Sequence, residues 1–70
     1  MNKNELRDML DLGVVTIRTT RIVDGKSEEY VFQAHGHDIH ENVENLIITM
    51  NYNTHEFIVL NPANVLSASL

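Results

Sequence analysis

The sequence predicts a single α+β domain over residues 1–70, with a small antiparallel sheet of four to five strands and two short helices. β-Branched and aromatic residues gather in short runs that turn residues separate, a pattern typical of antiparallel strands. One such break is the Asp24-Gly25 pair, which is a strong hairpin signal. Apolar residues recur at helical spacing at the N-terminus and again near the middle of the chain. We therefore expect the order helix, two strands, helix, three strands.

The first helix is predicted at residues 2–12. Asn2 can cap it, and Glu5 three residues later completes a pattern similar to a capping box. Three apolar side chains share one face: Leu6, Met9 and Leu10. Gly13 marks its end. Because so short a helix is marginal alone, we expect it to dock on the sheet.

Residues 14–23 and 28–34 are predicted to pair as a hairpin. Asp24-Gly25 suits the two central positions of a type I′ turn, which both have positive φ. A two-residue loop sets four cross-strand pairs: Arg21 with Glu28, Thr19 with Tyr30, Ile17 with Phe32, and Val15 with Ala34. This register gathers large apolar groups on one face and joins opposite charges across the strands.

A second short helix is predicted near residues 39–45. Asp38 followed by Glu41 again fits a capping box. Apolar residues recur there at helical spacing: Ile39, Val43, Leu46 and Ile47. We expect Asp38 to cap this helix.

Three more strands are expected at residues 46–52, 55–60 and 65–70. A tight turn at Asn53-Thr54 separates the first two, and the segment NPAN (61–64) is a turn with proline at the favoured second position. The tail IVLNPANVLSA resembles the closing segment of small Src-homology-type barrels, where a strand, a proline-containing turn and a last strand follow one another. The resemblance implies a partly open small β-barrel as the alternative architecture.

A chain of 70 residues without cysteine has a small core and no disulfide or thiolate zinc site to support it. Domains of this size bury only about 60% of their unfolded surface, so a homodimer is one expected way to bury more. No apolar run reaches the roughly 18–20 residues that span a bilayer. The N-terminus MNKNELRDML lacks the apolar core of a secretion signal. We expect a cytoplasmic protein with no membrane partner.

The net charge of −5 is distributed unevenly along the chain. All five basic residues lie before position 27: Lys3, Arg7, Arg18, Arg21 and Lys26. Residues 27–70 contain six acidic residues and no Lys or Arg: Glu28, Glu29, Asp38, Glu41, Glu44 and Glu56. Direct nucleic-acid binding is disfavoured, because affinity for a polyanion comes largely from Lys and Arg that neutralise phosphates.

Three histidines and two carboxylates lie within the segment HGHDIHE (35–41). Imidazole and carboxylate are ligands for zinc, copper or nickel, which makes His35, His37 and His40 weak metal candidates, with His55 as an additional ligand. The segment resembles the H-x-H-x-D-H loop of the metallo-β-lactamase group, but its acid falls one place early and that fold needs a far longer chain. The alternatives are a polar loop with solvated histidines, which we prefer, and a pH-sensitive patch.

Catalytic groups are poorly represented, so we expect a protein that is not an enzyme and needs no cofactor. None of the three serines lies in a G-x-S-x-G context. The three glycines stand alone and form no phosphate-binding loop. Paired carboxylates need a cleft, which a domain this small rarely offers.

The acidic residues suggest a different activity. Asp38, Glu41 and Glu44 recur every third residue, a rise of roughly 4.5 Å per step on a helix. Glu28, Glu29 and Glu56 on neighbouring strands would extend this array of negative charge. Such a surface attracts a cationic groove over long range. The alternative is that the acids only solubilise the protein.

Size, acidity, absence of cysteine and the cation-free C-terminal region resemble the small early proteins with which lytic phages take over a bacterial host. Within that group the chain is similar to DNA-mimic inhibitors, such as the phage inhibitor of the bacterial nucleoid protein HU. The resemblance implies an acidic homodimer, in the host cytoplasm, that occupies the DNA-binding surface of a basic HU-type protein. The mimic surface would comprise Glu28, Glu29, Asp38, Glu41, Glu44 and Glu56. The basic residues of the first hairpin depart from a uniformly acidic mimic.

Two other functions stay open. One is a protein–protein interaction module, which docks on a host enzyme or polymerase through an exposed apolar edge or the last strand. The other is a metal-responsive regulator built on the histidine cluster. Binding through an apolar edge would survive high salt, whereas binding through charge would weaken with salt.

Overall fold

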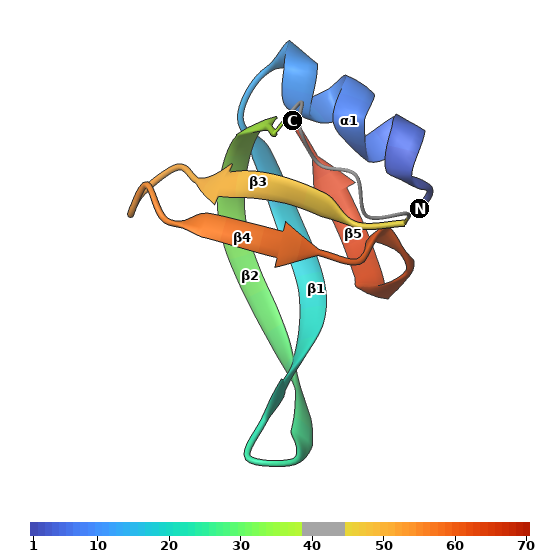
Figure 1. Ribbon diagram of the computed structural model, residues 1–70, viewed down its shortest axis with the longest axis vertical. Helices are drawn as coiled ribbons and strands as arrows, with labels where there is room; N and C mark the ends of the chain where they lie inside the picture. Colours follow the sequence, from blue (N-terminus) through green and yellow to red (C-terminus); the bar gives the residue numbers. More distant parts are fainter. Residues whose placement is uncertain (39–44) are drawn as a thin grey trace.

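The computed structural model describes residues 1–38 and 45–70, and within them one helix precedes five strands (Figure 1). The elements are α1 (Lys3–Leu12), β1 (Val15–Val23), β2 (Lys26–His37), β3 (Ile47–Asn51), β4 (Phe57–Leu60), the 3-10 turn η1 (Pro62–Asn64) and β5 (Val65–Ser69). The predicted α+β class is confirmed, with five strands and a short N-terminal helix.

The strands form one antiparallel sheet in the order β4-β3-β2-β1-β5. In Figure 1 the β3–β4 hairpin crosses the long β1–β2 hairpin steeply, and α1 lies across the end of the sheet remote from the β1–β2 turn. β4 and β5 lie at opposite edges, so the sheet is open and not closed into a barrel. The predicted succession of strand, proline turn and strand at the tail is confirmed.

α1 begins and docks as its sequence predicts. The Asn2 side chain accepts a hydrogen bond from the Glu5 amide at 2.9 Å and donates one to the Glu5 carboxylate at 2.9 Å. Leu6 and Leu10 are buried, and Met9 packs against them. The helix and all five strands contribute to the core, whose buried apolar residues are Leu6, Leu10, Val15, Ile17, Phe32, Ala34, Ile47, Leu60 and Val65.

The β1–β2 hairpin has the predicted register. All four predicted pairs occur, from Arg21 opposite Glu28 to Val15 opposite Ala34. Asp24 and Gly25 both have positive φ, 52° and 76°, as a tight two-residue turn requires. The inward-facing Tyr30 and Phe32 rings stack with their centroids 5.2 Å apart.

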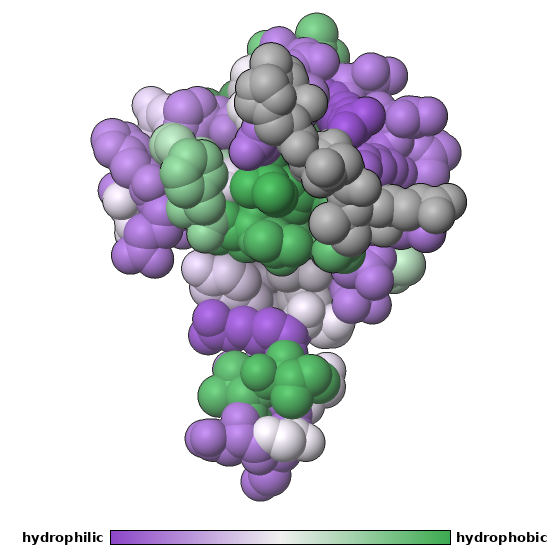
Figure 2. Space-filling model, in the orientation of Figure 1, coloured by the Kyte–Doolittle hydropathy of each residue, from purple (hydrophilic) through white to green (hydrophobic). Residues whose placement is uncertain are grey.

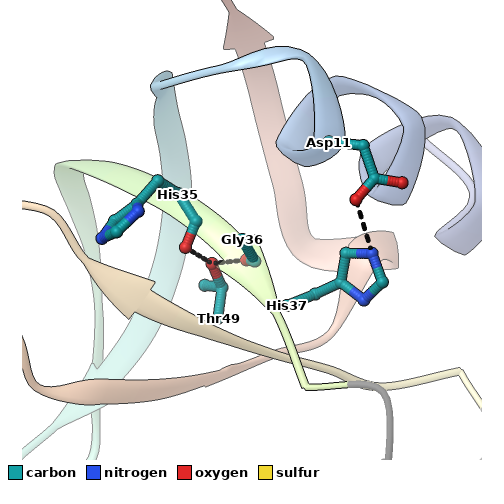
Figure 3. Close-up of polar contacts among 5 residues, drawn as sticks. All are labelled: Asp11, His35, Gly36, His37 and Thr49. Atoms are coloured by element: carbon teal, nitrogen blue, oxygen red, sulfur yellow. Dashed lines mark hydrogen bonds and ion pairs between the residues drawn. The ribbon is translucent and has the colours of Figure 1, made fainter.

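β2 continues further than predicted, through His35 and His37, so these residues lie in a strand and not in a polar loop. Gly36, at φ 65°, allows a shift in pairing with β3 between the two histidines. The Thr49 hydroxyl donates to the Gly36 carbonyl at 2.6 Å and lies 3.4 Å from the His35 carbonyl (Figure 3). The Asp38 amide then donates to the Ile48 carbonyl at 2.9 Å. Backbone pairing with β3 therefore extends β2 beyond Ala34, the last residue that the sequence predicted for this strand.

The second helix predicted near 39–45 falls on residues 39–44, which lie outside the described part of the chain. Asn45, the last residue of that range, adopts a positive φ of 66°. No second α-helix occurs in residues 1–38 and 45–70, where the other helical segment is η1. In η1 the Asn61 side chain accepts from the Ala63 amide at 3.0 Å, and the Thr19 hydroxyl of β1 donates to the Asn64 carbonyl at 3.1 Å.

Candidate functional site

Two of the predicted mimic carboxylates are paired with arginines across the first hairpin. Glu29 forms an ion pair and hydrogen bond with Arg18, and the Arg21 Nε lies 3.7 Å from the Glu28 carboxylate. The Arg21 guanidinium also lies over the Tyr30 ring, 4.1 Å from its centroid. These side chains are about half exposed, so each pair stabilises the fold by at most about 1 kcal/mol. Their charges nevertheless cancel locally.

The remaining acidic candidates lie in a different part of the molecule. The β1–β2 hairpin carries three Lys or Arg residues and three acidic residues, whereas residues 38–70 carry four acidic residues and no Lys or Arg. Asp38 is half-buried at the end of β2, and Glu56 is exposed directly before β4. Glu41 and Glu44 lie outside the described residues. The six predicted residues therefore do not form one uniformly negative surface, because arginines neutralise Glu28 and Glu29.

The histidines of β2 do not converge on one point. Figure 3 shows the His35 and His37 side chains extending in different directions from the strand. The His37 Nε2 lies 3.0 Å from the Asp11 carboxylate on α1, whereas the His35 ring meets the Tyr52 ring edge-on at 5.4 Å. The pairing shift at Gly36 separates them, since without it residues two apart would share a face.

This arrangement does not support chelation of one ion by His35 and His37. Residues 1–38 and 45–70 contain no group of three metal-ligating side chains. His55 is exposed in the β3–β4 turn, and His40 lies outside the described residues. His35 Nε2 and His37 Nδ1 are buried and have no hydrogen-bond partner within the described structure. The histidines thus contribute to packing, and His37 links β2 to α1.

A group of apolar side chains lies on the outer face of the β3–β4 hairpin. Ile48 pairs with Val59, and Met50 pairs with Phe57. Phe57 is 72% exposed and Val59 is 62% exposed, although both are large apolar residues in a regular strand. Figure 2 shows an apolar area over the middle of β3 and β4, in contrast to the polar surface around it. We call these four residues the β3–β4 apolar face.

The sequence contains a pattern that predicts this face, although prediction of the strand alone did not reveal it. Four consecutive apolar residues, FIVL, make up β4, so two of them must point away from the core whatever the register. Ile58 and Leu60 face inward, which leaves Phe57 and Val59 outside. An antiparallel strand with one solvated face normally alternates apolar and polar residues. The unbroken run therefore indicates a second apolar contact.

A cleft of about 490 Å³ lies beside β4. All four residues of β4 line it, together with Thr19, Thr20 and Arg21 of β1 and the Tyr30 ring of β2. A pocket above one face of a strand is lined by alternate residues, because successive side chains point to opposite faces. Because four consecutive residues of β4 line this cleft, it runs along the edge of the strand, between β4 and the β1–β2 hairpin.

Comparison with protein-family models, with curated proteins and with solved structures found no match to this chain. No helix in the described part of the chain combines the length and the apolar character needed to cross a bilayer.

Proposed function

We propose that this protein is a binding module that docks on another protein through the β3–β4 apolar face, and that it is not an enzyme. The observation that carries this proposal is the exposure of Phe57 and Val59, two residues apart, on the same face of an edge strand. Isolated apolar side chains on a surface are ordinary, whereas a contiguous group marks a contact site.

The energetic argument rests on the same residues. Full burial of one large apolar side chain contributes about 1.5–3 kcal/mol. Few interface residues dominate binding, and aromatic side chains are over-represented among them. Phe57 therefore suits the role of the central anchor, with Val59, Ile48 and Met50 forming the apolar area around it.

Phe57→Lys is expected to reduce capture of the protein partner from a bacterial lysate at least tenfold, at both low and high salt. Val31→Lys is the matched control, because Val31 is also exposed but lies on the central strand β2. Quantitative mass spectrometry after affinity capture measures the effect. Equal loss with both variants, or no loss with Phe57→Lys, would contradict the proposal.

An acidic DNA mimic that blocks a basic host DNA-binding protein is the second candidate function. The observation that favours it is the excess of four acidic residues over residues 38–70, which contain no Lys or Arg. Because Glu28 and Glu29 are paired with Arg21 and Arg18, the mimic surface proposed here is smaller than the sequence suggested. It consists of Asp38, Glu41, Glu44 and Glu56.

Replacement of both Glu41 and Glu44 by Lys is expected to abolish displacement of DNA from a purified HU-type protein, because it reverses the charge that the cationic groove attracts. The control is Asp8→Lys, an exposed charge reversal on α1, and it should retain displacement, whereas Glu41→Lys changes the net charge equally and should weaken displacement. Fluorescence anisotropy of labelled DNA at two salt concentrations measures this. Displacement that survives the Glu41 and Glu44 reversals would exclude mimicry.

A further inference from the structure

The sheet has two open edges. Within residues 1–38 and 45–70, β4 pairs only with β3, and β5 pairs only with β1. Each edge strand therefore has a row of backbone amide and carbonyl groups that meet no second strand in the described structure. Such a row is a template on which another strand can add.

Neither edge carries the charged residues that usually prevent this addition. β4 is FIVL and β5 is VLSAS, and neither contains a charged residue or a proline. Natural edge strands are commonly protected by Lys, by Pro or by bulges. β5 has one irregularity, a shift in its pairing with β1 near Leu66, but the pairing is regular from Ser67 to Ser69. Leu66 itself is 55% exposed.

The cleft beside β4 lies along the strand to which a further strand would add. It follows the whole strand and is bounded on its far side by Thr19–Arg21 and the Tyr30 ring. An approaching strand adds about 4.8 Å from its neighbour. β5 has small residues at Ser67, Ala68 and Ser69, whose side chains take up little space beside a neighbouring strand.

Charge favours pairing between unlike edges over pairing of two β4 edges. Two β4 edges would bring together two copies of Glu56, which is exposed directly before β4. β5 contains no charged residue, and neither Asn64 before it nor Leu70 after it has a charged side chain. A β4 edge that meets a β5 edge therefore avoids this repulsion between like charges.

We propose that the β4 edge of one copy binds the β5 edge of a second copy, so that the chains assemble head to tail through a continuous sheet. The interface is heterologous, so it leaves one open edge at each end and can extend to a ring or a filament. This inference concerns the strand edge and a second copy of the chain. It does not depend on the β3–β4 apolar face binding another protein.

The test uses one Lys variant at each edge and measures mass by light scattering over a range of protein concentrations. The wild-type chain is expected to form species larger than the 8.0 kDa monomer as concentration rises. Val59→Lys blocks the β4 edge, and Leu66→Lys blocks the β5 edge, so each variant alone should be monomeric. Val31→Lys, on the central strand, should assemble like the wild type.

An equal mixture of Val59→Lys and Leu66→Lys provides the decisive measurement. The first variant keeps its β5 edge and the second keeps its β4 edge, so the mixture should form species of two chains and none larger. A dimer of Leu66→Lys alone would show β4–β4 pairing, and a dimer of Val59→Lys alone would show β5–β5 pairing. Either result, or a wild type that stays monomeric at every concentration, overturns the proposal. Circular dichroism confirms that each variant is folded.

The same variants separate this inference from the proposed function. Leu66 lies outside the β3–β4 apolar face, so Leu66→Lys should lose assembly and retain capture of the protein partner. Met50→Lys changes the β3–β4 apolar face on β3, which is not an edge strand, so it should lose capture and retain assembly.

Discussion

At the scale of single residues, polar side chains in turns hold the strands in place. Asn51, at the end of β3, is buried, and its side-chain oxygen accepts from the amides of Asn53 and Thr54 at 2.9 and 3.2 Å. Its backbone also pairs with His55 and Glu56. The turn therefore depends on one asparagine that fixes two backbone amides. The sequence marked the turn, but it did not indicate which asparagine would organise it.

Asn51→Ala is expected to reduce the free energy of unfolding by about 1–3 kcal/mol, because the two turn amides lose their acceptor. Asn53→Ala is the control, since the Asn53 side chain is exposed and makes one long contact of 3.5 Å with Gln33. That control should change stability by no more than about 0.5 kcal/mol. Urea denaturation followed by circular dichroism measures both, and equal effects would contradict the role given to Asn51.

At the scale of elements, the structure shows how a short helix is retained by a small sheet. α1 has ten residues and a capped N-terminus, yet a helix of this length is marginal without tertiary contacts. Leu6 and Leu10 supply those contacts by burial against the sheet, and Asp11 near its end binds His37 of β2. Leu12, in contrast, is 74% exposed. The periodicity of the sequence identified the docking face correctly.

Leu6→Ala should therefore lower the free energy of unfolding by about 2–5 kcal/mol, through lost burial and the cavity left behind. Leu12→Ala removes the same atoms from the same helix at an exposed position, and its effect should be within about 0.5 kcal/mol. The difference between their urea midpoints checks the argument. Similar midpoints would show that α1 does not dock as described.

At the scale of the whole molecule, the balance between a small core and exposed apolar surface governs the behaviour of the chain. Only nine apolar residues are buried among the described residues, while Phe57, Val59 and Leu66 are exposed on the two edge strands. A domain of this size buries a small share of its surface and gains from a second copy. Assembly would add to stability by mass action, since only folded chains present intact edges.

The urea midpoint of the wild-type chain is accordingly expected to rise with protein concentration. In Leu66→Lys the midpoint should be independent of concentration, because the β5 edge is blocked, whereas Val31→Lys should keep the wild-type dependence. Denaturation curves at several concentrations provide the measurement. A concentration-independent midpoint for the wild type would mean that folding and assembly are not linked.

Much of the local structure could be predicted from the sequence, because it depends on residues close together in the chain. The Asp24-Gly25 turn set the register of the first hairpin, and Asn2 with Glu5 set the start of α1. The histidine segment was less predictable. A backbone shift at Gly36 and hydrogen bonds from Thr49, twelve or more residues away, keep it in β2.

The sequence by itself determined the N-terminal helix, the presence of five strands, the hairpin register and the uneven distribution of charge, since propensity, turn chemistry and composition are local properties. Tertiary structure alone decided which charges and apolar groups lie together. It paired Glu29 with Arg18, separated His35 from His37, and placed β4 and β5 at the open edges. These outcomes depend on how distant strands cross and curve, because side chains far apart in sequence meet only after the sheet has formed.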